Sequence, residues 1–140
     1  MRAVFNVFSG TGNTHKVCRA IMGEWRASGV ECKYVNIEKD CEVRDPNSFD
    51  RMVIGYPVHA FNAPQIVFDF IKRLPVSMGG VVVYLVKTSG EPLSLNDGSC
   101  AHVSDLLKKK GYSVAGEYHY VMPYNMIFRH SDGMAARMWQ

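Results

Sequence analysis

No hydrophobic run in the 140-residue sequence is long enough to span a bilayer. The first residues, Met1-Arg2-Ala3-Val4, lead straight into an apolar strand pattern and leave no room for a signal peptide. We therefore expect a soluble, cytoplasmic protein that does not bind membranes. Hydrophobic residues make up 47% of the chain, which is enough for one core and too few for two, so residues 1–140 are expected to form a single domain.

The sequence also lacks the cysteine spacing of two kinds of metal site. The cysteines are Cys18, Cys32, Cys41 and Cys100, and none of them belongs to a C-x-x-C pair. An iron–sulfur cluster or a zinc site within these residues is therefore not expected. The interpretation that we prefer is free thiols, most of them buried.

The sequence lacks an excess of acidic residues, because its formal net charge is +3. Its densest charge run, Lys108-Lys109-Lys110, fits the last turn of a helix, where cations interact favourably with the helix dipole. We interpret this run as a solvated helix face, and no nucleic-acid partner is expected.

The most informative segment is Phe8-Ser9-Gly10-Thr11-Gly12-Asn13-Thr14, which joins a strand pattern to a helix pattern. Residues 3–8 are apolar almost throughout, as in a strand buried on both faces of a parallel sheet. Gly10 and Gly12 let the backbone bend closely around an anion, and the N–H groups of the helix start point into the bend. The side-chain donors of this loop are the hydroxyls of Ser9, Thr11 and Thr14 and the amide of Asn13. The segment therefore predicts a loop that binds a phosphate monoester through neutral dipoles, without any Lys or Arg of its own.

Three other phosphate-binding loops fit the segment less well. A Walker-type loop ends in Gly-Lys-Ser/Thr, whereas this chain has Thr14-His15-Lys16-Val17. A dinucleotide fingerprint needs a third small residue where His15 stands. A phosphatase loop would carry a nucleophilic cysteine, and the nearest, Cys18, lies a turn into the helix. An ordinary helix capped by Ser or Thr after a glycine turn remains the alternative to a phosphate loop.

The segment resembles the phosphate loop of the flavodoxins, which has the form Ser/Thr-x-Thr-Gly-Asn-Thr/Ser. Ser9-Gly10-Thr11-Gly12-Asn13-Thr14 matches this form at every position. In that family the loop holds the 5′-phosphate of FMN, so the resemblance implies FMN as the cofactor here. The resemblance covers nearly the whole chain. It is closest to the flavodoxin module of proteins that also carry a ferredoxin-type iron–sulfur domain, through Gly55-Tyr56-Pro57-Val58-His59 and Met122-Pro123-Tyr124-Asn125.

Strand and helix patterns alternate along the chain, which predicts a parallel sheet with helices on both faces. Strands are expected at residues 3–8, 31–37, 51–55, 81–86 and 112–122, with the fourth of them central. Helices are expected at residues 14–28, from Pro64 to just before Pro75, and from a cap at Ser99 to Gly111, with only a short helix in the polar stretch 38–48. The resemblance implies an α/β, doubly wound, five-stranded sheet in the order 2-1-3-4-5, with FMN at the switch between strands one and three.

Two further strand-to-helix loops would lie at the same edge of the sheet, where open parallel sheets bind ligands. Flavodoxins place loops in these positions against the isoalloxazine ring, so the resemblance implies ring contacts from both. The first loop runs from Tyr56 to Ala63 and contributes Pro57, Val58, His59, Ala60, Phe61 and Asn62. The second loop contributes Thr88, Ser89, Gly90 and Glu91.

Within the first of these loops, Phe61 or Tyr56 is expected to stack on the flavin, and His59 to form a hydrogen bond with the ring edge. Each contact has a simpler alternative, in which Phe61 packs under the following helix and His59 lies in solvent. The Trp and Tyr that stack on the flavin in flavodoxins have no obvious counterpart in this sequence.

The resemblance implies an electron-transfer module that binds FMN noncovalently, in which the flavin does the chemistry and the protein sets its potential. The alternative is a flavin-dependent oxidoreductase acting on its own small substrate, for which His59 or Glu91 would have to serve as the acid. A third interpretation is a cofactor-free signalling receiver of the same fold. It needs an acidic cluster at the end of the first strand, where this chain has Ser9 and Thr11.

The partner is expected to be a redox protein or a fused ferredoxin-type iron–sulfur domain. Free-standing flavodoxins are typically strongly acidic, so a charge of +3 favours a module linked covalently to its partner. Residues 131–140 present Met134, Ala135, Met138 and Trp139 as an apolar face. They make at most about two helical turns, which leaves the last helix of a doubly wound domain incomplete. Residues 1–140 are therefore expected to be the N-terminal portion of a longer protein, and the isolated domain to dimerise with Met134, Met138 or Trp139 between chains.

Overall fold

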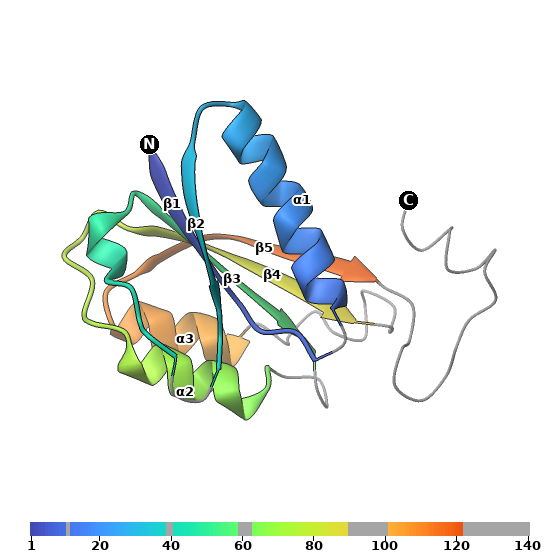
Figure 1. Ribbon diagram of the computed structural model, residues 1–140. Helices are drawn as coiled ribbons and strands as arrows, with labels where there is room; N and C mark the ends of the chain where they lie inside the picture. The colour runs from blue at the N-terminus through green and yellow to red at the C-terminus, as the bar shows by residue number, and fades with distance from the viewer. Residues whose placement is uncertain (11, 39–40, 59–62, 90–100, 122–140) are drawn as a thin grey trace, which may run out of the picture.

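The computed structural model describes residues 1–10, 12–38, 41–58, 63–89 and 101–121. In these ranges one sheet is formed by β1 (Arg2–Val7), β2 (Glu31–Asn36), β3 (Arg51–Pro57), β4 (Val82–Ser89) and β5 (Ser113–Val121). The helices are α1 (Asn13–Ala27), α2 (Gln65–Arg73), α3 (Ala101–Lys109) and the short 3₁₀ helix η1 (Pro46–Ser48). Neighbouring strands are parallel and lie in the order β2-β1-β3-β4-β5, which confirms the predicted doubly wound fold (Figure 1).

The helices cover the sheet from both sides. Helix α1 lies on one face, whereas α2 and α3 lie on the other (Figure 1). Successive side chains of a strand point to opposite faces, so β1 contributes Val4 to the core under α2 and α3, and Phe5 to the core under α1. Both side chains are fully buried. The sequence of β1 is apolar almost throughout because neither face of this strand meets solvent.

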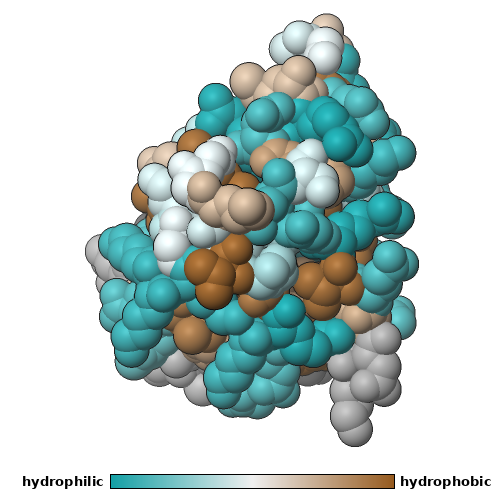
Figure 2. All heavy atoms as spheres, turned by 90° about the vertical axis from the view of Figure 1, so that its left-hand side faces the viewer, coloured by the Kyte–Doolittle hydropathy of each residue, from teal (hydrophilic) through white to brown (hydrophobic). Residues whose placement is uncertain are grey.

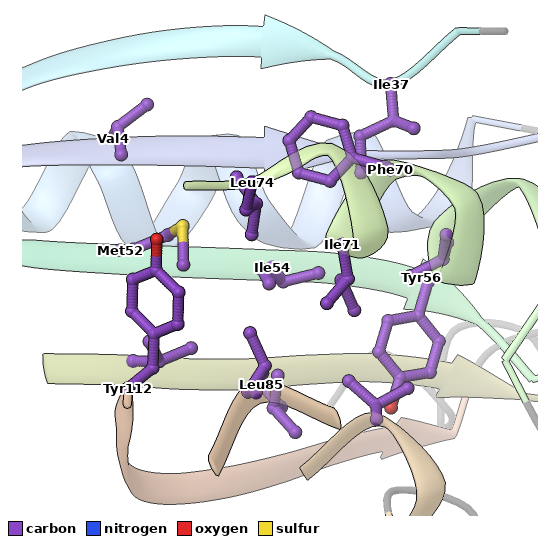
Figure 3. Close-up of a cluster of buried hydrophobic side chains, with 14 of the residues drawn as sticks. Val4, Ile37, Met52, Ile54, Tyr56, Phe70, Ile71, Leu74, Leu85 and Tyr112 are labelled. Carbon is purple, nitrogen blue, oxygen red and sulfur yellow. The ribbon is translucent and has the colours of Figure 1, made fainter. Parts of the chain in front are cut away.

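The larger core lies between the sheet and helices α2 and α3 (Figure 3). Phe70 and Ile71 of α2 pack in one cluster with Ile54 of β3 and Leu85 of β4, and all four side chains are fully buried. Burying a side chain of this size contributes about 1.5–3 kcal/mol to stability. This layer therefore holds α2 firmly against β3 and β4, whose ends begin the two predicted ring loops.

Three predicted boundaries are wrong. Pro64 does not occupy the first helical position, because its backbone is extended, with φ −61° and ψ 149°, and α2 begins at the next residue. Strands β3 and β4 also run beyond the predicted ends at Gly55 and Val86. Their carboxyl ends pair with each other, and Pro57 lies opposite Thr88 in the ladder. The first residues of both predicted ring loops are therefore strand residues.

Lys110 was predicted, together with Lys108 and Lys109, to lie on a solvated helix face, but the structure gives it a further role. Its Nζ donates hydrogen bonds to the carbonyl oxygens of Lys72 (2.8 Å) and Leu74 (2.6 Å), at the end of α2. A cation both satisfies the last carbonyl groups of a helix and suits the negative end of its dipole. Lys110 therefore caps α2, whereas Lys108 and Lys109 are exposed as predicted.

Figure 2 views the molecule from the side on which β1 begins and shows hydrophobic atoms in separate patches among hydrophilic ones. Helices in the described ranges do not reach the length and hydrophobicity of a membrane-spanning segment.

The thiols that the structure describes are free and mostly buried, as predicted from the sequence. Cys18 and Cys32 are buried and free, and Cys41 is free and half-buried. Cys100 and the predicted helix cap Ser99 lie outside the described residues, as do residues 131–140, for which an incomplete helix was predicted.

Candidate functional site

The loop between β1 and α1 closes on itself at the carboxyl edge of the sheet. The backbone N–H of Gly12 donates a hydrogen bond to Ser9 Oγ over 2.9 Å. Gly12 is the N-cap of α1 and has a φ of 96°, a left-handed conformation that strains any residue with a Cβ. Next comes the hydrogen bond from the Lys16 N–H to the Gly12 carbonyl oxygen (3.1 Å). The chain thus turns from strand to helix in the tight manner that the glycines predicted.

The first turn of α1 offers a helix N-terminus to a ligand. Gly12 has no side chain with which to cap the helix, and the first turn contains no acidic residue. A Cβ built on Gly10 or Gly12 would meet no heavy atom within 4 Å, so open space lies beside both glycines. Ser9 Oγ accepts from Gly12 and can still donate its own proton to a further acceptor. Backbone N–H groups, the positive end of the helix dipole and a hydroxyl form a donor set that suits a phosphate group.

Thr14 is more buried than expected for a hydrogen-bond donor in an exposed loop. It is the second residue of α1, is only 1% exposed, and its hydroxyl lies 2.8 Å from the hydroxyl of Thr88 in β4. The structure thus brings together two residues that were predicted in separate loops. Asn13 begins α1 and Gly10 is exposed, whereas Thr11 lies outside the described residues.

Helix α1 packs closely on β3 at Gly55. A Cβ at this position would lie 2.5 Å from Cys18 Sγ and 3.3 Å from Thr14 Cγ2. The lack of a side chain at Gly55 therefore lets the start of α1 approach the sheet. Burial raises the pKa of the Cys18 thiol to about 12. The thiol therefore stays protonated at neutral pH, which agrees with the rejection of a phosphatase loop.

The loop after β3 is described in part. Tyr56, proposed from the sequence as a stacking residue, is fully buried and belongs to the core under α2 and α3 (Figure 3). That proposal is wrong, because β3 continues to Pro57 and strand alternation puts Tyr56 on the same face as Ile54. Val58 is half-buried, and its N–H donates to the Thr88 carbonyl oxygen (2.8 Å). The other predicted contacts of this loop, which lie outside the described residues, are His59, Ala60, Phe61 and Asn62.

Thr88 and Ser89 were predicted to begin the second ring loop, but they end β4 and are tied to other elements. Thr88 is 3% exposed and contacts Thr14 of α1 through its hydroxyl. Ser89 Oγ forms a hydrogen bond of 2.6 Å with Nε2 of His119 in β5. Gly90 and Glu91 lie outside the described residues.

Asn6 and Lys87 are among the buried polar residues of the described ranges that were not singled out from the sequence. Asn6 of β1 is 1% exposed, and neither of its amide atoms has a hydrogen-bond partner in the part of the chain that the structure describes. Lys87 of β4 is 3% exposed and lies in the ladder between Tyr56 and His119. The signal that could have found them is a polar residue within or directly after an apolar run, because such runs predict buried strands.

His15 and Tyr34 form a pair beside the first turn of α1. Nδ1 of His15 and the hydroxyl of Tyr34 are hydrogen-bonded, and the Arg19 guanidinium lies 5.3 Å from the centroid of the Tyr34 ring. Burial and the charge of Arg19 lower the pKa of His15, and burial raises the pKa of Tyr34 to about 12. At neutral pH the imidazole is therefore mostly uncharged, and its tautomer decides whether His15 or Tyr34 donates the proton of this bond. His15 thus adds no positive charge to the loop, which leaves dipoles to hold an anion there.

A family model described as a flavodoxin domain matches residues 5–110, which include the loop of residues 9–14 and the whole of β3 and β4. The chain belongs to the flavodoxin family. Membership agrees with the strand order of the sheet and with the resemblance found in the loop sequence. No curated protein sequence matches the chain.

Solved structures with the flavodoxin fold are similar to this chain over most of its length. A short-chain flavodoxin associated with a PDU bacterial microcompartment has a TM-score of 0.70 at 19% identity, over 89% of this chain and 87% of that one. An NADH:FMN oxidoreductase in its apo form has a TM-score of 0.70 at 12% identity, over 99% and 84%. A flavoprotein from Lactobacillus acidophilus in complex with FMN has a TM-score of 0.64 at 16% identity, over 84% and 92%. Identities this low establish the shared fold alone.

Proposed function

We propose that this flavodoxin-family domain binds FMN noncovalently and passes electrons between redox partners. The observation that carries the proposal is the loop of residues 9–14. It closes through the bond from Gly12 to Ser9, has glycine in the left-handed region, and opens a helix with no acidic residue in its first turn. Membership of the flavodoxin family supports the same ligand. The similarity to a flavoprotein in complex with FMN adds support at the level of the fold.

The proposed site divides the ligand between three loops. The residues that would hold the phosphate are Ser9, Gly10, Thr11, Gly12, Asn13 and Thr14. The residues that would flank the ring are Pro57, Val58, His59, Ala60, Phe61, Asn62, Thr88, Ser89, Gly90 and Glu91. When bound, the flavin supplies the ring that accepts and releases electrons. The chain binds its phosphate, orients its ring and shields the ring from water.

An oxidoreductase acting on its own small substrate is the second candidate function. The similarity in fold to an NADH:FMN oxidoreductase, at a TM-score of 0.70, favours it. Such an enzyme must bind a reductant or substrate beside the flavin, whereas a carrier receives electrons from a protein. The two are distinguished by mixing FMN-loaded protein with NADH in the absence of oxygen. Rapid bleaching of the flavin absorption would favour the enzyme, and slow bleaching favours the carrier.

The proposed electron partner is a redox protein or a fused ferredoxin-type iron–sulfur domain, in the cytoplasm. The net charge of +3 supports a linked partner, since long-range attraction by a strongly charged surface is then not needed. The buried free thiols of Cys18 and Cys32 suit a reducing compartment.

Titration of the purified protein with FMN and with riboflavin tests the proposed cofactor. Thr11→Ala combined with Asn13→Ala should weaken FMN binding by more than about tenfold, because hydrogen bonds to a charged group contribute about 1.5–3 kcal/mol each. Riboflavin has the same ring but no phosphate, so its affinity should change much less. The dissociation constants follow from the quenching of flavin fluorescence.

Ser28→Ala is a matched control for this titration, because Ser28 is exposed and lies at the opposite end of α1. Its affinity for FMN should equal that of the wild type. An unchanged FMN affinity in the Thr11→Ala/Asn13→Ala variant would contradict the phosphate site.

A further inference from the structure

Thr14 and Thr88 form a buried hydrogen bond between the start of α1 and the end of β4. Their hydroxyl oxygens lie 2.8 Å apart, and either hydroxyl can be the donor. The two residues are 1% and 3% exposed, so water competes little for this bond. The bond ties the helix that follows the candidate phosphate loop to a strand residue 74 positions further along the chain.

Thr88 also joins the other two candidate loops. Its carbonyl oxygen accepts a hydrogen bond from the N–H of Val58, which follows β3 (2.8 Å). The next residue, Ser89, ends β4 and is bonded to His119 of β5 (2.6 Å). Thr88 therefore contacts the helix of the phosphate loop through its side chain and the loop after β3 through its backbone, and it lies next to the last residue of β4.

The Thr14 side chain is held on two sides. Its methyl group faces β3, where Thr14 Cγ2 lies 3.3 Å from the position that a Cβ on Gly55 would take. Its hydroxyl faces Thr88. Thr14 stands in the first turn of α1, so a shift of this side chain also shifts the N–H groups proposed to bind the phosphate.

The direction of the bond has a chemical consequence. A threonine hydroxyl has one proton and two lone pairs, so when Thr88 donates to Thr14, the Thr14 proton stays available to an anion. Valine at position 88 would remove this donor and leave the Thr14 hydroxyl buried without its partner. That loss disfavours the present position of the helix start.

We propose that Thr88 is a positioning residue for the phosphate loop, which through its hydrogen bond to Thr14 sets the preference of the site for phosphorylated over unphosphorylated flavin. The inference deepens the proposed FMN function and rests on it. Thr88 acts through Thr14 and does not touch the phosphate. Removing the Thr88 hydroxyl therefore lowers the affinity for FMN more than the affinity for riboflavin.

The test compares the dissociation constants of FMN and riboflavin in the wild type and in Thr88→Val. The ratio of the riboflavin constant to the FMN constant should fall by about threefold to tenfold in Thr88→Val, as expected for one buried hydrogen bond. Thr88→Ser keeps a hydroxyl and should keep the wild-type ratio. A wild-type ratio in Thr88→Val, including an equal loss of affinity for both flavins, would overturn the proposal.

A double-mutant cycle shows whether Thr88 acts through Thr14. In a Thr14→Val background, Thr88→Val should not lower the ratio further. A further fall would mean that Thr88 acts on the phosphate by a route other than Thr14, and it would overturn the proposal. The double variant replaces both hydroxyls by methyl groups and leaves neither unpaired. If Thr88→Val alone does not fold, the comparison of Thr14→Val with the double variant still tests the proposal, because a further fall in the ratio would overturn it.

The same measurements separate this inference from the proposed function. A wild-type protein that binds riboflavin as tightly as FMN contradicts the phosphate site, and with it both proposals. A wild-type protein that prefers FMN, combined with an unchanged ratio in Thr88→Val, contradicts the role of Thr88 alone.

Discussion

Asn6 lies in β1 between two residues of the α1 core and shares its own face of the strand with Val4. It is 1% exposed, and its amide has no partner within the described residues. A buried polar group without a hydrogen bond costs about 1–3 kcal/mol. At the scale of single residues, we therefore expect Asn6 to lower the stability of a strand that is otherwise apolar beyond Arg2.

We predict that Asn6→Val raises the free energy of unfolding by about 1–3 kcal/mol, because valine has a similar volume and no polar group to desolvate. Urea denaturation of the FMN-free protein measures the change. Asn36→Val is the control, because Asn36 is exposed at the end of β2, and it should stay within about 0.5 kcal/mol of the wild type. A loss of stability in Asn6→Val would show that the amide is satisfied in solution.

At the scale of elements, the position of α1 depends on the absence of a side chain in β3. The space next to Gly55 is taken by Cys18 Sγ, which would lie 2.5 Å from an added Cβ. Cys18 is fully buried, so its sulfur cannot turn out to solvent. The close contact between helix and strand therefore requires glycine at position 55.

Gly55→Ala should lower the free energy of unfolding by about 1–3 kcal/mol, the usual cost of overpacking a core. It should also weaken FMN binding, because the start of α1 has to move. Adding Cys18→Ala removes the sulfur that clashes, so the double variant should be more stable than Gly55→Ala alone, although Cys18→Ala itself leaves a small cavity. Thermal unfolding of the four proteins in this cycle measures the coupling. Additive effects would mean that the clash is relieved in another way.

At the scale of the whole molecule, the described residues leave a groove of about 320 Å³ on the face that carries α1. Its aromatic lining consists of Trp25, Tyr84, Tyr118 and Tyr120. Tyr118 and Tyr120 remain 48% and 38% exposed. They belong to β5, the outermost strand on this side of the sheet, so the groove lies at a margin that a second chain can reach.

We predict that the 140-residue chain forms a dimer in which a second copy covers this groove. Tyr118→Lys combined with Tyr120→Lys should convert the dimer to a monomer, because the new charges would have to be desolvated in the interface. Light scattering at micromolar concentration measures the mass. Met134, Met138 and Trp139, expected from the sequence to lie between chains, are outside the described residues.

Met78→Lys is the control for this experiment, because Met78 is 87% exposed and precedes β4, away from the groove. It should leave the dimer intact. A wild-type protein that is monomeric under the same conditions would contradict the prediction.

The candidate site contains some contacts between residues close in sequence and others between residues far apart in sequence, and only the first kind could be predicted. Ser9 and Gly12 could be interpreted from the sequence because their contact spans three positions of the chain and the positive φ of Gly12 is a local property. Tyr56 was misplaced because the end of β3 depends on the pairing of Pro57 with Thr88. That pairing joins segments far apart in the chain, and periodicity within one segment does not report it.

The sequence by itself determined the alternation of strands and helices, the glycine-rich turn into α1 and, through the resemblance of that turn, the flavodoxin fold. Each of these depends on residues that are neighbours along the chain. Only the tertiary structure decided that Thr14 meets Thr88 and that Gly55 lies against Cys18. The physical reason is that hydrophobic periodicity specifies which face of an element is buried. It does not specify which side chain of another element that face contacts, because the contact depends on which strands are adjacent and how closely a helix approaches them.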